Sequence, residues 1–67
     1  MRTNLKVFRV KQNLTQGELA EKLGYTRACL SAIEQGKREG RAAFWNALQK
    51  AFSLDYEALQ ELRRNDE

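Results

Sequence analysis

Apolar residues recur every three or four positions along most of this chain, which is the spacing of one buried face of an α-helix. No run of residues reads as a convincing β-strand. Short polar runs, glycines and an asparagine separate five segments that have this helical spacing. The pattern therefore predicts an all-α fold, a compact bundle of five short helices around one core, in a single domain over residues 1–67.

Residues that begin and end helices mark the boundaries of these segments. Asn13 is expected to close the first helix, because asparagine tolerates the left-handed backbone conformation. Thr15 and Glu18 have the spacing of a capping box at the start of the second helix, and Gly24 is expected to end that helix. Thr26 is expected to cap the third. Further boundaries are predicted at Gly36, which closes the third helix, and at Asp55, which caps the fifth.

The predicted core follows from the same spacing. In chain order the expected inner residues are Leu5 and Phe8 with Val7 as an alternative member, Leu19, Ala20 and Leu23, Leu30 and Ile33, then Phe44, Trp45, Leu48, Ala51 and Phe52 on a helix over 42–52, and finally Tyr56, Leu59 and Leu62. The charged end, residues 63–67, is expected to fray. Trp45 is expected to be a core residue, and Tyr25 to lie in the core with its hydroxyl at the surface.

The second and third helices are separated by the short break Leu-Gly-Tyr-Thr at 23–26. A short turn containing glycine usually sets two helices at about 90–120° to each other. The inner residues of both helices then meet in the angle, and small Ala20 allows a close approach. The residues left outward on the third helix are Arg27, Ala28, Ser31, Ala32 and Gln35. This face is nearly free of acidic side chains.

Charge is distributed unevenly along the chain. Residues 1–50 contain ten Lys and Arg and four Asp and Glu, a net charge of +6, whereas residues 51–67 contain two and five, a net charge of −3, so the total is +3. A basic body suggests a surface that attracts an anion such as nucleic acid. The alternative explanation is charge that serves only solubility.

Composition also limits the possible chemistry. The chain has no histidine and one cysteine, so the usual hydrolase, thiol-enzyme and zinc arrangements are missing. We therefore expect no enzyme activity, no metal site and no cofactor. Without a signal segment or a possible disulfide, we expect a cytoplasmic protein. No apolar run approaches the roughly 20 residues of a membrane span.

The segments LTQGELAEKLG at 14–24 and IEQGK at 33–37 closely resemble the Cro/phage-repressor type of helix-turn-helix DNA-binding domain, the XRE-like or Cro/C1-type family. The resemblance extends from about Leu5 to Leu59, with the helix-turn-helix at about 15–36. It implies a lambda-repressor-like bundle in which the second helix crosses the DNA backbone and the third enters the major groove.

The resemblance also implies roles for individual residues. The base-contacting positions are Arg27, Ala28, Ser31 and Ala32, and the backbone-contacting positions are Thr15, Gln16, Thr26, Gln35, Lys37, Arg38 and Arg41. Arg27 can contact guanine O6 and N7, whereas the two alanines offer only methyl contacts. Solvated loop charge is the alternative for Lys37, Arg38 and Arg41. Arg9 and Glu34 match residues that form a structural ion pair in this family. Cys29 is expected near the DNA surface, as a small residue at a crowded contact, with a redox switch as the alternative.

These features predict a sequence-specific regulator of transcription that binds double-stranded DNA, a small repressor of phage or mobile-element type or an antitoxin. The family implies a homodimer on a palindromic operator, with the dimer surface near Tyr56, Leu59 and Leu62. No small-molecule ligand and no membrane partner are implied. Because alanine occupies two reading positions, the alternatives are a helix-turn-helix module used for protein contacts or for nonspecific DNA binding.

Overall fold

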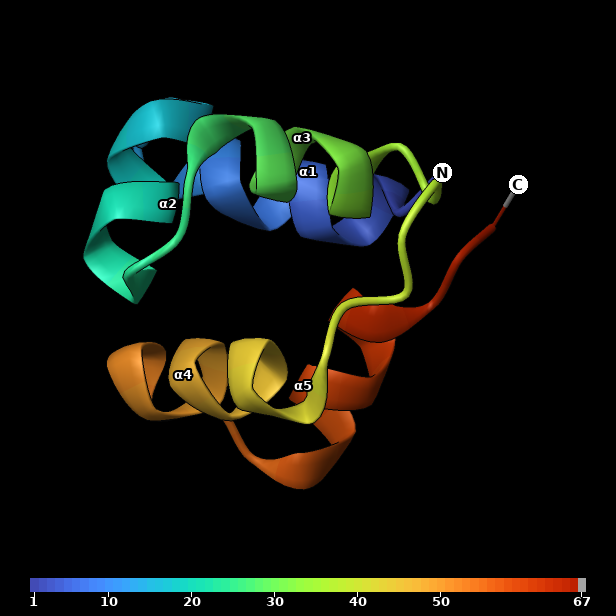
Figure 1. Ribbon diagram of the computed structural model, residues 1–67. Helices are drawn as coiled ribbons and strands as arrows, with labels where there is room; N and C mark the ends of the chain where they lie inside the picture. Colours follow the sequence, from blue (N-terminus) through green and yellow to red (C-terminus); the bar gives the residue numbers. More distant parts are fainter. Residues whose placement is uncertain (67) are drawn as a thin grey trace.

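The computed structural model describes residues 1–66. This part of the chain forms five α-helices and no strand (Figure 1): α1 (Thr3–Lys11), α2 (Gln16–Leu23), α3 (Arg27–Glu34), α4 (Ala42–Phe52) and α5 (Tyr56–Arg63). The all-α prediction is confirmed, and each predicted segment corresponds to one helix.

The predicted helix boundaries are formed by the expected residues. The Thr15 hydroxyl accepts a hydrogen bond from the Glu18 N–H at 3.1 Å, and the Glu18 carboxylate accepts one from the Thr15 N–H at 2.9 Å. This capping box satisfies two N–H groups that have no partner within the helix. Asn13 adopts the left-handed conformation, with φ 61°. Asp55 caps α5 by accepting a hydrogen bond from the Ala58 N–H at 2.8 Å.

The helices enclose one core. Helices α1, α2 and α3 lie together, and α4 and α5 cover them from one side (Figure 1). The closest packing joins α2 to α3 and α1 to α5. The buried apolar side chains are Leu5, Leu19, Ala20, Leu23, Leu30, Ile33, Phe44, Trp45, Leu48, Leu59 and Leu62. Phe8, Tyr25 and Phe52 are partly buried against them, and the ring edges of Phe8 and Phe52 meet with centroids 5.0 Å apart.

Three residues predicted or considered for the core lie at the surface. Val7 and Tyr56 are 43% and 72% exposed, and Ala51 is also exposed. Tyr56 begins α5, and the helix is covered by its neighbours only from the following turn, where Leu59 is buried. Ala51 and Val7 stand at the edges of their helical faces, beside Phe52 and Phe8, which take the inner positions.

The chain after α5 returns to the start of α1. Residues 64–66 are not helical, but the Asp66 N–H donates to the Met1 carbonyl oxygen at 2.7 Å, and the Thr3 hydroxyl donates to the Asp66 carboxylate at 3.1 Å. The region expected to fray is therefore helical at Arg63 and held by hydrogen bonds as far as Asp66. Residue 67 lies outside the described residues. Within residues 1–66, no helix has the length and apolar character needed to cross a membrane.

Candidate nucleic-acid interface

The turn between α2 and α3 is short, and its backbone is fixed by one left-handed glycine and by two hydrogen bonds. Gly24 has φ +83°, in the left-handed region that glycine adopts without steric cost. The next N–H, that of Tyr25, donates to the Ala20 carbonyl oxygen at 2.8 Å. The Thr26 hydroxyl then accepts from the Cys29 N–H at 3.1 Å and starts α3. Short polar contacts thus fix the direction in which α3 leaves α2.

The outer face of α3 is small and uncharged except at its first residue. Arg27 and Ala28 are exposed, Ser31 and Ala32 are half-buried, and Gln35, just after the helix, is exposed. The Gln35 amide donates to the Ser31 hydroxyl at 2.8 Å. Among the described residues Arg27 has no ion pair or hydrogen-bonded side-chain partner. Its guanidinium is therefore available for a bidentate contact with a guanine edge.

The side chain of Arg27 lies next to the start of α2. A Cβ built on Gly17 would lie 4.0 Å from Arg27 Cδ, so the two helices are close neighbours at this point. Thr15 and Gln16 belong to the same helix end, which is oriented with free N–H groups available to an anion. Arg27, a predicted base contact, therefore lies beside the helix end that carries the predicted phosphate contacts Thr15 and Gln16.

Beneath this surface lies the ion pair that the family resemblance implied. Arg9 Nε and Glu34 Oε2 are 2.7 Å apart, and the side chains are 10% and 2% exposed. Arg9 also donates to the Leu14 carbonyl oxygen at 2.8 Å. The Gln16 amide donates to Glu34 Oε1 at 3.0 Å. Glu34 thus orients Gln16, a predicted phosphate contact, while one amide N–H of Gln16 has no partner among the described residues.

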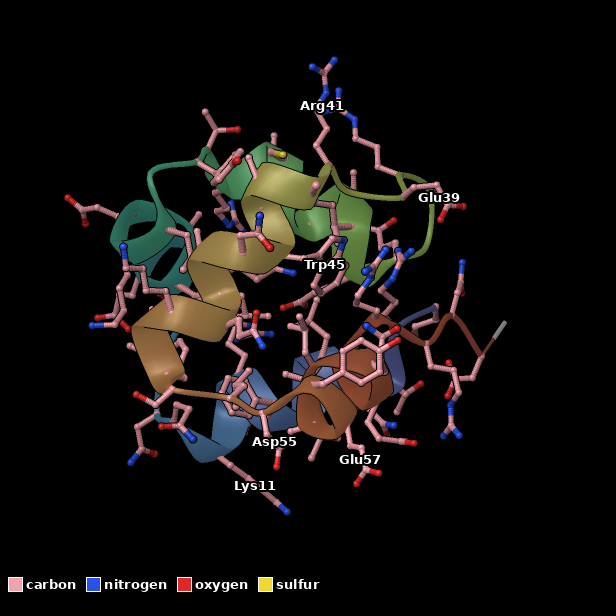
Figure 2. All side chains as sticks on the ribbon, turned by 90° about the horizontal axis from the view of Figure 1, so that it is seen from below. Lys11, Glu39, Arg41, Trp45, Asp55 and Glu57 are labelled. Atoms are coloured by element: carbon pink, nitrogen blue, oxygen red, sulfur yellow. The ribbon has the colours of Figure 1, made fainter. Side chains whose placement is uncertain are left out.

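The α3–α4 loop, residues 35–41, forms the other edge of the surface. Lys37, Arg38 and Arg41 are exposed, and no ion pair joins them to a carboxylate within residues 1–66. The carboxylate of Glu39 is also exposed in this loop. In Figure 2 Arg41 projects from one end of the molecule, whereas Asp55 and Glu57 lie at the opposite end with Lys11. Three cations and one carboxylate thus belong to this loop, whereas Asp55 and Glu57 lie away from Arg41.

Cys29 lies on the inner side of α3, in the groove that it lines together with Arg38 and Arg41 of the loop. It is four residues before Ile33 and therefore on the same side of α3. It is partly buried against the core, and Tyr25 and Phe44 line the same groove. Tyr25 meets Phe44 edge to face, with ring centroids 5.4 Å apart. Cys29 thus faces α4 rather than the exposed stripe of α3.

Sequence patterns missed one buried residue altogether. Arg2 is only 3% exposed, and its guanidinium donates to the carbonyl oxygens of Ile33, Arg38 and Arg63, each at 2.8 Å. From sequence, a single arginine near the start of a chain is normally predicted to be exposed to solvent. No pattern of side chains predicts that an arginine will donate to backbone carbonyls. Arg2 joins the start of α1, the end of α5 and the α3–α4 loop.

The described residues include no cluster of His, Cys, Asp and Glu that could hold a metal ion. The groove beside α3 is lined by the Cys29 thiol and by Glu39, but no histidine stands beside them, because the chain has none. The surface instead offers hydrogen-bond donors and cations around an exposed helix. Such a surface fits duplex nucleic acid, whose phosphates attract cations and whose base edges accept hydrogen bonds in the grooves.

Comparison with known proteins identifies the family. The sequence profile described as helix-turn-helix domain matches residues 1–63. The chain belongs to the helix-turn-helix domain family. This membership confirms the predicted helix-turn-helix and makes the chain a DNA-binding domain of the transcriptional-regulator type, not an enzyme.

The relatives carry consistent names. The chain is 39% identical over 57 residues to a protein of Methanocaldococcus jannaschii named uncharacterized HTH-type transcriptional regulator MJ0272, covering 85% of this chain and 86% of that protein. Two Archaeoglobus fulgidus proteins, each named uncharacterized HTH-type transcriptional regulator, are 49% and 46% identical over 37 residues, which are 55% of this chain and 52% and 53% of theirs. No solved structure gives a significant match. The individual DNA contacts stay predictions.

Proposed function

We propose that the protein is a sequence-specific regulator that binds duplex DNA with α3 in the major groove and represses transcription by occupying a promoter. The observation that carries this proposal is the outer face of α3, which has no carboxylate, begins with the unpaired Arg27 and is bordered by the cations of the α3–α4 loop. No catalytic step is involved. A protein with this target acts in the cytoplasm.

Specificity rests on few side chains. Arg27 reads guanine, a contact worth about 1–3 kcal/mol of discrimination against other bases. Ala28 and Ala32 contact at most thymine methyl groups, and Ser31 is already hydrogen bonded to Gln35. Phosphate contacts from Gln16 and the loop cations fix the orientation of the helix on the duplex. The expected recognition site therefore has one strongly specified guanine in each half-site.

The proposal includes a homodimer on a palindromic operator, as the family implies. Of the three residues expected at the dimer surface, Leu59 and Leu62 are buried in the protomer's own core, and Tyr56 is 72% exposed. Tyr56 therefore offers the apolar surface for the second copy. Its neighbours Asp55 and Glu57 are acidic, so pairing of two copies through this surface is expected to strengthen as salt rises.

Selection from randomised duplexes, followed by sequencing, tests the proposal. The expected result is a palindrome with guanine at matched positions, and Arg27→Ala is expected to lose the guanine preference. Lys11→Ala removes a cation from the opposite end of the molecule (Figure 2) and is the matched control, with the preference unchanged. Enrichment of a single half-site would contradict the proposed dimer but not sequence-specific binding. No enrichment by the folded protein would contradict sequence-specific binding and favour a module for protein contacts or nonspecific binding.

A further inference from the structure

The α3–α4 loop has almost no apolar side chain to hold it. Residues 35–41 read Gln-Gly-Lys-Arg-Glu-Gly-Arg, and Gly36 and Gly40 both have positive φ, +80° and +79°. Loops of such composition are ordinarily held by hydrogen bonds to their backbone rather than by burial. The hydrogen bonds to the carbonyls of this loop therefore fix its backbone, and the backbone fixes where the side chains of Lys37, Arg38 and Arg41 begin.

Arg2 donates to two carbonyls of this loop and to the last carbonyls of α3, while Asn65 donates to a third loop carbonyl, that of Gly36, at 3.4 Å. Arg2 Nη1 donates to the carbonyl oxygens of Ile33 and Arg38 at 2.8 Å, and Nη2 donates to that of Glu39 at 3.4 Å. Its backbone N–H donates to the Glu34 carbonyl oxygen at 2.7 Å. These acceptors include the last carbonyls of α3, which form the negative end of the helix dipole; the Ile33 carbonyl oxygen also accepts from the Gly36 N–H at 3.1 Å. The guanidinium thus both ends α3 and fastens the loop that follows.

The position of Arg2 is itself fixed from two further sides. Its Nε donates to the Arg63 carbonyl oxygen at 2.8 Å. Its guanidinium carbon lies 5.6 Å from the centroid of the Trp45 ring, and the Trp45 indole N–H donates to the Glu39 carbonyl oxygen at 3.1 Å. Glu39 therefore shares its carbonyl between Arg2 and Trp45. Four separated parts of the chain meet here, namely residue 2, residues 33–39, residue 45 and residue 63. This network holds a loop that has few apolar side chains of its own.

We infer that Arg2 is a positioning residue for DNA binding: it does not touch DNA but holds the α3–α4 loop so that the exposed Lys37 and Arg38 meet phosphates. The inference rests on the proposed function, since it assigns those cations to the DNA backbone. An ordered cation loses less conformational entropy on binding than a disordered one. Freeing the loop is therefore expected to weaken binding without changing the bases that are preferred.

Arg2→Lys is the decisive variant, because an ammonium keeps the charge but cannot hold carbonyls in several directions as the planar guanidinium does. At 10 °C and low salt we expect duplex binding to weaken about three- to tenfold. The slope of log affinity against log salt should fall by about 1 to 2, since Lys37 and Arg38 each contribute about 0.9 when they contact a phosphate. The guanine preference should be unchanged. Heteronuclear ¹⁵N NOE values should fall for residues 37–40 and stay constant in α1 and α2.

A double-mutant cycle with Arg38→Ala separates positioning from general stability. In the wild-type background this substitution should reduce the salt slope by about 0.9, as expected for one phosphate contact. In the Arg2→Lys background it should have little further effect, because the Arg38 side chain is already displaced. Lys11→Ala, in both backgrounds, is the control, with unchanged slopes expected.

Each outcome decides the inference. Additive effects of Arg2→Lys and Arg38→Ala, or an unchanged salt slope in Arg2→Lys, would overturn it while leaving DNA binding intact. Global unfolding of Arg2→Lys at 10 °C would also overturn it, since the guanidinium would then support the whole fold rather than the loop. A wild-type protein that shows no salt-dependent duplex binding would remove the proposed function, and this inference with it.

Discussion

Two buried arginines hold the ends of the recognition unit, and they do so with different partners. Arg9, 9% exposed, faces the buried carboxylate of Glu34 with a 2.7 Å contact. Arg2, 3% exposed, faces backbone carbonyls, and its nearest carboxylate, on Glu39, is 3.4 Å away and 93% exposed. One charge is neutralised by an opposite charge inside the protein, whereas the other is solvated by oriented peptide dipoles.

This difference predicts different responses to mutation. A buried ion pair is sensitive to the loss of one partner, because the remaining charge is left without compensation. A guanidinium held by several carbonyls depends little on any single acceptor, but its acceptors belong to a loop whose backbone must keep its conformation. The Arg9 region should therefore be most sensitive to changes of charge, and the Arg2 region to changes of backbone.

The largest effect is expected for Glu34→Ala. The substitution leaves Arg9 buried without its carboxylate and also removes the acceptor of Gln16. The free energy of unfolding should therefore fall by about 3–5 kcal/mol. Urea denaturation monitored by circular dichroism measures this change. The double variant Arg9→Met with Glu34→Leu removes both charges and should recover most of the loss. A loss of less than about 1 kcal/mol in Glu34→Ala would show that Arg9 finds another partner.

The next effect concerns the backbone around Arg2. Gly40 has φ +79°, and a Cβ at this position would lie 2.7 Å from the Trp45 indole nitrogen, which donates to Glu39. Gly40→Ala should therefore destabilise the fold by about 1–3 kcal/mol and shift the tryptophan fluorescence. Gly24→Ala is the matched control, because its φ is +83° but no atom lies within 4 Å of the added Cβ. Equal losses in both variants would mean that the contact with Trp45 adds nothing to the backbone cost.

The smallest effect is expected for Glu39→Gln. This change removes the one carboxylate near Arg2, but that side chain is 93% exposed and the two groups are 3.4 Å apart. Exposed pairs contribute little, so the free energy of unfolding should change by less than about 0.5 kcal/mol at 0.15 M salt. Urea denaturation checks this value. A loss above about 1 kcal/mol would show that Arg2 depends on the carboxylate after all, and the contrast with Arg9 would disappear.

The fold was predictable because its signals are local. Spacing of apolar residues placed the helices, and Thr15, Glu18, Thr26 and Asp55 marked their beginnings by hydroxyl and carboxylate groups that cap nearby N–H groups. The failures have two causes: Val7 and Ala51 stand at the edge of their helical faces, where Phe8 and Phe52 take the inner positions, and Tyr56 lies beyond the reach of the neighbouring helices. Helical periodicity says which side a residue takes, but it does not say where the neighbouring helices stop covering that side.

The candidate interface was predictable only in part. The α2–α3 unit and the Arg9–Glu34 pair follow from residue types that recur in a known family, and the structure places these side chains together. Arg2 was missed because its partners are carbonyl oxygens of residues 33, 38, 39 and 63. Every residue carries a carbonyl, so no choice of side chain reveals such a site, and only the packing of distant segments creates it.

The central claim is that one surface, made of the start of α2, the exposed stripe of α3 and the α3–α4 loop, contacts DNA. Titration of ¹⁵N-labelled protein with the selected duplex, followed by amide chemical shifts, tests it most directly. The account predicts shifts concentrated at residues 15–17, 26–32 and 35–41, with much smaller changes around Lys11 at the opposite end (Figure 2). Shifts at residues 55–57 are expected only where a second copy binds beside the first. Shifts concentrated in α1 and α5, with α3 unaffected, would contradict it.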